Sequence, residues 1–151
     1  LAALGADSIF IGDDSPTDSE LSLLTAIAPN TVALRARLLV KDTALHELLS
    51  KPFTARPDAA RDAIRAMEGR TRFHDMPLSP KNTVERPFGA VTVDNQDYPR
   101  YAGELQIVKR PQSADPRTNV VAQVLPEEQF LIPLIRPGQK FTFLFEDAPI
   151  K

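Results

Sequence analysis

The sequence predicts a mainly β protein with some α structure, a small β-barrel preceded by one β/α unit. Three observations lead to this fold class. Four short segments, GAVTVD, GELQIV, TNVVAQV and KFTFLFE, are rich in residues that favour strands. Fourteen prolines are typical of a compact, loop-rich β domain. The first residues, in contrast, read as the end of a helix, a strand and a second helix.

Residues 1–30 form the predicted β/α unit. Gly5 is expected to cap a helix, and the apolar burst SIFI suits a strand of a parallel sheet that is buried on both faces. Ser15, Pro16 and Asp18 have the spacing of a helix start. Because a lone β/α unit cannot bury its strand, we expect residues 1–30 to be the remnant of a larger domain.

Residues 31–70 are predicted to contain a strand and two helices. In TVALRARLLV, apolar and polar residues alternate in part, which indicates a half-exposed antiparallel strand. Asp42 is the expected N-cap of a short helix in DTALHELLS. A clearer helix is expected in RPDAARDAIRAMEGR, opened by Pro57 and closed by Gly69, with Ala60, Ile64 and Met67 on its apolar side.

The remainder is predicted to be mostly β. Phe141, Phe143 and Phe145 are spaced by two and therefore point to one side of a strand. A helix of about two turns is expected in PEEQFLIPLI, starting at Pro126 and limited by Pro133.

Composition narrows the classes of function. The net charge is −2, so bulk electrostatics give no indication of a nucleic-acid partner. No apolar run is long enough to predict a membrane span. The chain has no cysteine, and neither His46 nor His74 has a second ligand at metal spacing. We therefore expect no metal or other cofactor.

An ordered set of segments carries a family resemblance. These are SIFIGDD, RPDAARDAIRAMEGR, FGAVTVDNQDYPRYAGELQI, PRTNVVAQVLPEE and GQKFTFLF. Together they resemble the C-terminal part of bacterial 6-phospho-N-acetylmuramidases, long filed as a domain of unknown function and often labelled "outer surface protein". The most specific part is D-N-x-x-Y-x-R-Y-x-G-E-L-Q-I, at residues 94–107.

The resemblance implies a fold and a function for the complete enzyme. An N-terminal TIM barrel would be followed by a cyclophilin-like β-barrel, so that residues 1–30 are the end of the first and residues 31–151 are the second. The enzyme would be a cytoplasmic glycoside hydrolase that cleaves 6-phospho-N-acetylmuramyl disaccharides during cell-wall sugar recycling. Its partners would be the TIM barrel of the same protein and the phosphorylated amino-sugar substrate, with no nucleic acid and no membrane.

No catalytic residue is assigned to this chain. Glycoside hydrolysis usually needs two carboxyl groups, and TIM-barrel enzymes carry them at the C-terminal ends of strands that are mostly absent here. The chain alone is therefore expected to be inactive. Asp13 and Asp14 follow the predicted barrel strand and are candidates to line the mouth of the substrate site; alternatively, they only begin a loop.

Arginines near the predicted helix are further candidates for substrate binding. A guanidinium suits a phosphate or a carboxylate, because its forked donors match paired oxygens. Arg65 is preferred among Arg56, Arg61, Arg65 and Arg70, since the resembling family also has arginine there. The alternative is a solvated helix face paired with Asp58, Asp62 and Glu68.

The 94–101 stretch holds more polar and aromatic residues than a plain hairpin needs. Asp94 and Asn95 are predicted to turn the chain through side-chain bonds to nearby backbone amides. Tyr98, Arg100 and Tyr101 would then be displayed for contact with the neighbouring barrel or its substrate; alternatively, the loop is self-contained and purely structural. Glu104 shares a strand face with Gln106 and either reaches a ligand or supports the loop, and support is favoured.

Three hypotheses remain for the domain. It is an accessory domain of the glycosidase, a structural or dimerisation module without ligand contact, or a prolyl isomerase. The last rests on fold alone, which does not carry function, and the cyclophilin pattern of a catalytic arginine with aromatic partners is not found.

Overall fold

The computed structural model describes residues 15, 17, 18 and 30–146. The β/α unit predicted for residues 1–30, including Asp13 and Asp14, therefore lies almost entirely outside the described residues. Ten elements follow in chain order: β1 (Thr31–Leu38), α2 (Thr43–Leu49), β2 (Phe53–Thr54), β3 (Ala63–Arg65), α3 (Gly69–Arg72), β4 (Ala90–Asp94), β5 (Leu105–Val108), β6 (Thr118–Val124), η2 (Pro126–Leu134) and β7 (Lys140–Phe145).

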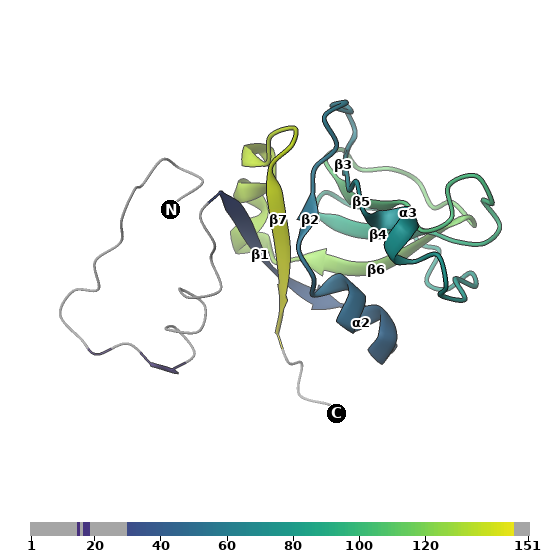
Figure 1. The fold of residues 1–151 in the computed structure, drawn as a ribbon, viewed down its shortest axis with the longest axis horizontal. Coiled ribbons are helices and arrows are strands. Elements are labelled where there is room, and N and C mark those ends of the chain that lie inside the picture. The colour runs from purple at the N-terminus through teal and green to yellow at the C-terminus, as the bar shows by residue number, and fades with distance from the viewer. Residues whose placement is uncertain (1–14, 16, 19–29, 147–151) are drawn as a thin grey trace.

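The strands form one seven-stranded sheet in the order β2-β7-β1-β6-β4-β5-β3. Figure 1 shows how this sheet curves, so that β2 and β3, its two edges, approach each other. A bridge between Ala55 and Ala66 joins these edges, and the backbone amide of Met67 donates to the carbonyl of Thr54 at 2.8 Å. The domain is therefore barrel-like and mainly β, as predicted.

The four predicted strands of the second half are confirmed as β4, β5, β6 and β7. The alternation predicted for residues 31–40 is also present, because Val32, Leu34 and Ala36 are buried while Arg37 is exposed. However, β1 is not purely antiparallel. It lies between β7 and β6 in the sheet, and it pairs parallel with β7 and antiparallel with β6.

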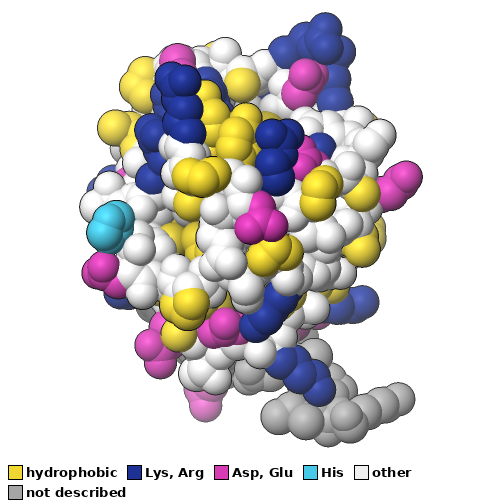
Figure 2. Space-filling model, turned by 90° about the vertical axis from the view of Figure 1, so that its right-hand side faces the viewer, with side chains coloured by type: hydrophobic (Ala, Val, Ile, Leu, Met, Phe, Trp, Pro, Cys, Tyr) yellow, Lys and Arg dark blue, Asp and Glu magenta, His cyan; other side chains and the backbone are white. Residues whose placement is uncertain are grey.

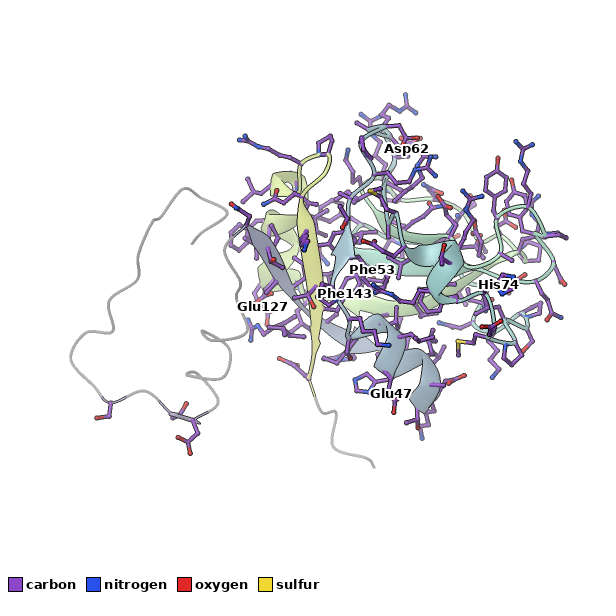
Figure 3. All side chains as sticks on the ribbon, in the orientation of Figure 1. Glu47, Phe53, Asp62, His74, Glu127 and Phe143 are labelled. Carbon is purple, nitrogen blue, oxygen red and sulfur yellow. The ribbon has the colours of Figure 1, made fainter. Side chains whose placement is uncertain are left out.

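The apolar core lies on the inner face of the curved sheet. Phe53 stacks on Phe141 with ring centroids 5.8 Å apart, and Phe143 meets Phe141 edge-on at 5.7 Å. All three side chains are at most 2% exposed, and Figure 3 labels two of them at the centre of the molecule. Leu105 and Ile107 of β5 are also in this core.

Two predicted helices are confirmed. In α2, the side chain of Asp42 accepts a hydrogen bond from the amide of Leu45 at 3.0 Å, which is the expected N-cap. The segment from Pro126 is helical over nine residues but is a 3-10 helix, η2, with Pro133 inside it. A 3-10 helix suits this segment because proline lacks the amide hydrogen that an α-helix interior requires.

The helix predicted over residues 56–70 is wrong. Residues 63–65 form strand β3, and Gly69 begins the short helix α3 instead of ending a long one. β3 pairs antiparallel with β5, which places Ile64 opposite Ile107 in the core and leaves Met67 55% exposed. Pairing with a distant strand outweighs the local helical spacing here.

Candidate functional site

A row of polar side chains crosses the outer face of the sheet, opposite the apolar core. Arg65 of β3 is the cross-strand neighbour of Gln106 of β5, which in turn neighbours Thr92 of β4. Directly opposed residues in antiparallel strands point to the same face. Arg56 extends this row, since its backbone amide donates to the carbonyl of Arg65 at 2.8 Å.

Glu104 comes directly before β5, two residues from Gln106 and therefore on the same face, and is only 3% exposed. One carboxylate oxygen is 3.3 Å from Nη1 of Arg56, and the other is 3.2 Å from Nε of Arg70. A buried carboxylate needs such partners. Glu104 therefore ties the 53–66 hairpin, which carries Arg56, to helix α3, which carries Arg70, and its supporting role is the one the contacts favour.

Asp58 connects two of the arginines. Its two carboxylate oxygens accept from Nε and Nη2 of Arg56 at 2.8 and 2.9 Å, and one of them also accepts from Nη2 of Arg65 at 2.7 Å. The forked contact with Arg56 lowers the pKa of Asp58 and raises the pKa of Arg56. One carboxylate is thus shared by two guanidinium groups.

The 94–104 loop is held by a buried polar network. Asn95 is fully buried, and its amide nitrogen donates to the carbonyl of Pro116 and to the side chain of Asn119, both at 2.9 Å. Its Oδ1 accepts from the amide of Asp97 at 3.0 Å, which is the local turn predicted for Asn95. The loop closes with the amide of Gly103 donating to the carbonyl of Asp94 at 2.8 Å.

The prediction that Asp94 also bonds a nearby amide is wrong. Its Oδ1 accepts instead from the hydroxyl of Thr118 on β6 at 2.8 Å, because the two residues are directly paired across the strands. Burial raises the pKa of Asp94 to about 6, the Thr118 hydrogen bond opposes this, and the nearby Glu104 adds to it.

Tyr98, Arg100 and Tyr101 lie on this loop as predicted. The two tyrosine rings meet edge-on with centroids 4.7 Å apart, and the guanidinium of Arg117 lies 4.3 Å above the Tyr98 ring. Arg100 is exposed, and its carbonyl accepts from Arg70 Nη1 at 3.4 Å. Arg70 therefore bridges Arg100, near the tip of the loop, and Glu104, at its C-terminal end. Figure 2 shows the side of the molecule that carries this region, where Lys and Arg side chains stand beside hydrophobic ones.

The structure brings two of the predicted site residues, Arg65 and Glu104, close to one shared partner. Arg65 and Glu104 meet the same partner, Arg56, through Asp58 in the first case and directly in the second. Pairing of the arginines with Asp58 and Asp62, the alternative to substrate binding, is also present. It occurs on a hairpin, so the expected solvated helix face does not exist.

Neither the role of Asp58 between two arginines nor the contact of Arg70 with Arg100 and Glu104 follows from the sequence pattern. Their roles depend on the turn of the 53–66 hairpin and on the contact of α3 with the loop. A signal was available in Pro57-Asp58, a pair of residues typical of turns.

Within residues 15, 17, 18 and 30–146, no group of three His, Cys, Asp or Glu side chains has a geometry that could hold a metal ion. In the same part of the chain, no helix has both the length and the apolar character of a membrane span.

The fold and this face define a class of protein: a barrel-like β domain whose outer sheet face carries arginines around a buried glutamate. Residues 32–144 match the family described as "6-phospho-N-acetylmuramidase, C-terminal". The match covers most of the chain, and the chain belongs to this family.

Solved structures share the fold. An uncharacterized B. cereus protein is 26% identical with a TM-score of 0.82, and the match covers 95% of this chain and 42% of that protein. A conserved Enterococcus faecalis protein of unknown function is 30% identical with a TM-score of 0.67, covering 78% and 31% of the two chains. A protein titled TTHA0988 is 19% identical with a TM-score of 0.53, covering 77% and 22%, and this likeness shows the fold alone.

The chain therefore spans less than half the length of the solved proteins it matches. No curated protein matches its sequence.

Proposed function

We propose that this chain is the accessory domain of a glycoside hydrolase that cleaves 6-phospho-N-acetylmuramyl disaccharides in the cytoplasm, during recycling of cell-wall sugar. The partner would be an N-terminal TIM barrel of the same protein, which would supply the catalytic carboxylates. Membership in a family named for the C-terminal part of such an enzyme supports this assignment. The cyclophilin-like description of the barrel belongs to the same proposal.

The observation that carries the proposal is the way the 94–104 loop is held. Its base is buried and fully bonded through Asn95 and Gly103, while Arg100 at its tip is exposed. A contact residue on a rigid base loses little conformational freedom on binding, which favours affinity. Tyrosine and arginine are also the residues that dominate contact surfaces.

In this proposal the candidate residues have different roles. Tyr98, Arg100 and Tyr101 contact the substrate or the catalytic barrel, and Arg65 faces the substrate's anionic groups. Glu104 is a positioning residue, because its carboxylate is occupied by Arg56 and Arg70. Asp13 and Asp14 would line the mouth of the barrel.

The test is Arg100→Ala in an intact enzyme that carries this domain, with turnover of a phosphomuramyl disaccharide and thermal stability measured on the same variant. Loss of a charge-assisted bond should lower kcat/KM by roughly ten- to a hundredfold. Because the Arg100 side chain is exposed, the melting temperature should stay nearly unchanged. Arg37→Ala, an exposed arginine on β1, is the matched control.

A structural or dimerisation module would give a different result. Arg100→Ala would then leave the turnover per folded molecule at the wild-type value, and any lost activity would follow lost stability. Turnover by the isolated 151-residue chain would also contradict the proposal, since it assigns the catalytic carboxylates to the partner barrel.

A further inference from the structure

Arg65 carries a donor that lacks an acceptor. Its Nε is buried, and it is the one buried side-chain nitrogen or oxygen without a hydrogen-bond partner in the described part of the chain. The other end of the guanidinium is occupied, since Nη2 donates to the carboxylate and the backbone carbonyl of Asp58. An unsatisfied buried donor on a charged group is unfavourable, so it indicates where an acceptor is missing.

The surroundings of Arg65 have an excess of positive charge. A hollow of about 60 Å³ is lined by Arg56, Asp58, Arg65 and Lys109, together with small and apolar residues of the hairpin and the segment before β7. Three of these four charged residues are cationic. Lys109 is fixed there, because its Nζ donates to the carbonyl of Ala60 at 3.1 Å. The field in the hollow therefore favours an anion.

Asp58 already shows how an anion fits this hollow. Its carboxylate makes a forked contact with Arg56 and a third contact with Arg65, which is how a bound carboxylate or phosphate engages two guanidinium groups. Yet the Asp58 side chain is 54% exposed, and residues 57–62 at the turn of the hairpin contain no helix or strand. Exposed ion pairs of this kind are weak and readily exchanged.

We propose that Arg56 and Arg65 form a binding site for an oxyanion group, a phosphomonoester or a carboxylate on a small sugar, and that Asp58 occupies this site when the ligand is absent. The incoming oxyanion takes over the donors that Asp58 holds and also accepts from Arg65 Nε. The hairpin turn moves aside as Asp58 is released. This inference deepens the proposed function and rests on it only for the class of sugar.

The experiment uses the 151-residue chain and follows the Nε–Hε resonances of its arginines by NMR. Three probes share one sugar and differ only in the group at C6: glucose 6-phosphate, glucuronate and glucose. We expect the Arg65 Nε–Hε resonance to shift with glucose 6-phosphate, with glucuronate, or with both, because its hydrogen gains an acceptor. Glucose should leave it in place. The two anionic arms identify which oxyanion the site accepts.

Variants separate the role of Asp58 from a general charge effect. Asp58→Asn should lower the dissociation constant of the effective probe about three- to tenfold, since the internal competitor is weakened. Asp62→Asn removes the same charge from the same turn, but Asp62 pairs with Arg61 and Arg110 and not with Arg65, so this change should alter the dissociation constant less than twofold. Arg65→Ala should abolish binding, whereas Arg61→Ala should preserve it.

Two results would overturn the inference. One is an Arg65 resonance that stays in place with both anionic probes at about 50 mM, well above a millimolar dissociation constant. The other is an Asp58→Asn variant that binds no better than Asp62→Asn, and this comparison decides even if Arg65→Ala fails to fold. Failure of the proposed glycosidase role is seen separately, in the activity of the intact Arg100→Ala enzyme.

Discussion

The 94–104 loop and the 53–66 hairpin bring charged side chains to the same side of the sheet, but they are held in different ways. The loop is held by Asn95, which is fully buried and whose side chain donates to Pro116 and Asn119 and accepts from Asp97. The hairpin turn is held by the ion pairs of Asp58 with Arg56 and Arg65, and the Asp58 side chain is 54% exposed. Buried bonds are costly to break and exposed ion pairs are not.

The two kinds of support decide which of the two regions can change on binding. A loop with a buried, satisfied base presents its tip in one conformation. A turn held by an exposed carboxylate can exchange that carboxylate for another anion. We therefore assign the fixed contact to the loop and the exchangeable contact to the hairpin. The following predictions test this division, beginning with the largest expected effect.

Gly69→Ala should be the most damaging change, because it separates α3 from the loop. A Cβ at this position would lie 2.7 Å from the carbonyl oxygen of Gly103 and 2.8 Å from the amide nitrogen of Leu105, and both are backbone atoms that cannot swing away. We expect a loss of about 3 kcal/mol in the free energy of unfolding, measured by chemical denaturation.

Gly138→Ala is the matched control for Gly69. Gly138 has a φ of +79°, but nothing lies within 4 Å of the added carbon, so only backbone strain remains. We expect a loss of about 1 kcal/mol there. Equal losses for the two variants would mean that α3 and the loop are not in close contact.

Asn95→Ala should weaken the base of the loop. It removes the donor to Pro116 and Asn119 and the acceptor for the amide of Asp97. With a buried polar group left unsatisfied, we expect a loss of about 2 kcal/mol in the free energy of unfolding. The neighbouring Gln96 is exposed, and Gln96→Ala should have an effect near zero. A loss below about 0.5 kcal/mol at Asn95 would mean that the loop, like the hairpin turn, is only weakly held.

Stability should depend on pH through Asp94, which is 5% exposed and has a pKa raised to about 6, first by burial. Between pH 4 and 6 the Asp94 carboxyl group is protonated in the folded protein and ionised in the unfolded chain. The contribution of Asp94 is therefore fully present below pH 4 and is lost as the pH rises through 6. Asp94→Asn keeps an acceptor for Thr118 without the charge.

The free energy of unfolding of Asp94→Asn minus that of the wild type is the quantity to compare. We expect this difference to be about 1 kcal/mol more favourable to the variant at pH 7.5 than at pH 4. The comparison of denaturation curves at the two pH values cancels the titration of all other groups. A stability difference between variant and wild type that is the same at both pH values would show that Asp94 does not titrate in this range.

Asp58→Asn should have the smallest effect on stability, with the melting temperature unchanged within about 2 °C. Arg56 keeps its contact with Glu104, and the side chains of Arg56 and Arg65 are both 29% exposed, so solvent can replace the lost carboxylate. A large drop in melting temperature would make Asp58 a structural residue of the hairpin, and it would then be unable to leave the oxyanion site.

The strands could be predicted because their β-branched and aromatic residues alternate with the period of a sheet, as in Phe141, Phe143 and Phe145. The short helix α2 was predictable from Asp42, since an N-cap acts locally. The hairpin was not. Ala60, Ile64 and Met67 have helical spacing, and only the pairing of Ile64 with Ile107, more than forty residues away in the chain, decides for a strand.

For the candidate site, the residue types were predictable from the sequence, but their contacts were not. Arg65, Glu104 and the tyrosines of the loop stand out as residue types suited to binding or support. The bridging role of Asp58 and the connection made by Arg70 depend on which strands pair and on how α3 meets the loop. Contacts of this kind arise from tertiary structure, so a single sequence does not specify them.

Amide hydrogen exchange tests the division between loop and hairpin most directly. The amides of Asn95, Gly103 and Glu104 donate to backbone carbonyls at 2.8 Å, and we expect them to open only with the global unfolding of the domain. Residues 58–62, outside any helix or strand, should exchange orders of magnitude faster. Exchange of the three loop amides at the rate of residues 58–62 would contradict the account, because the loop would then offer no fixed base for Arg100.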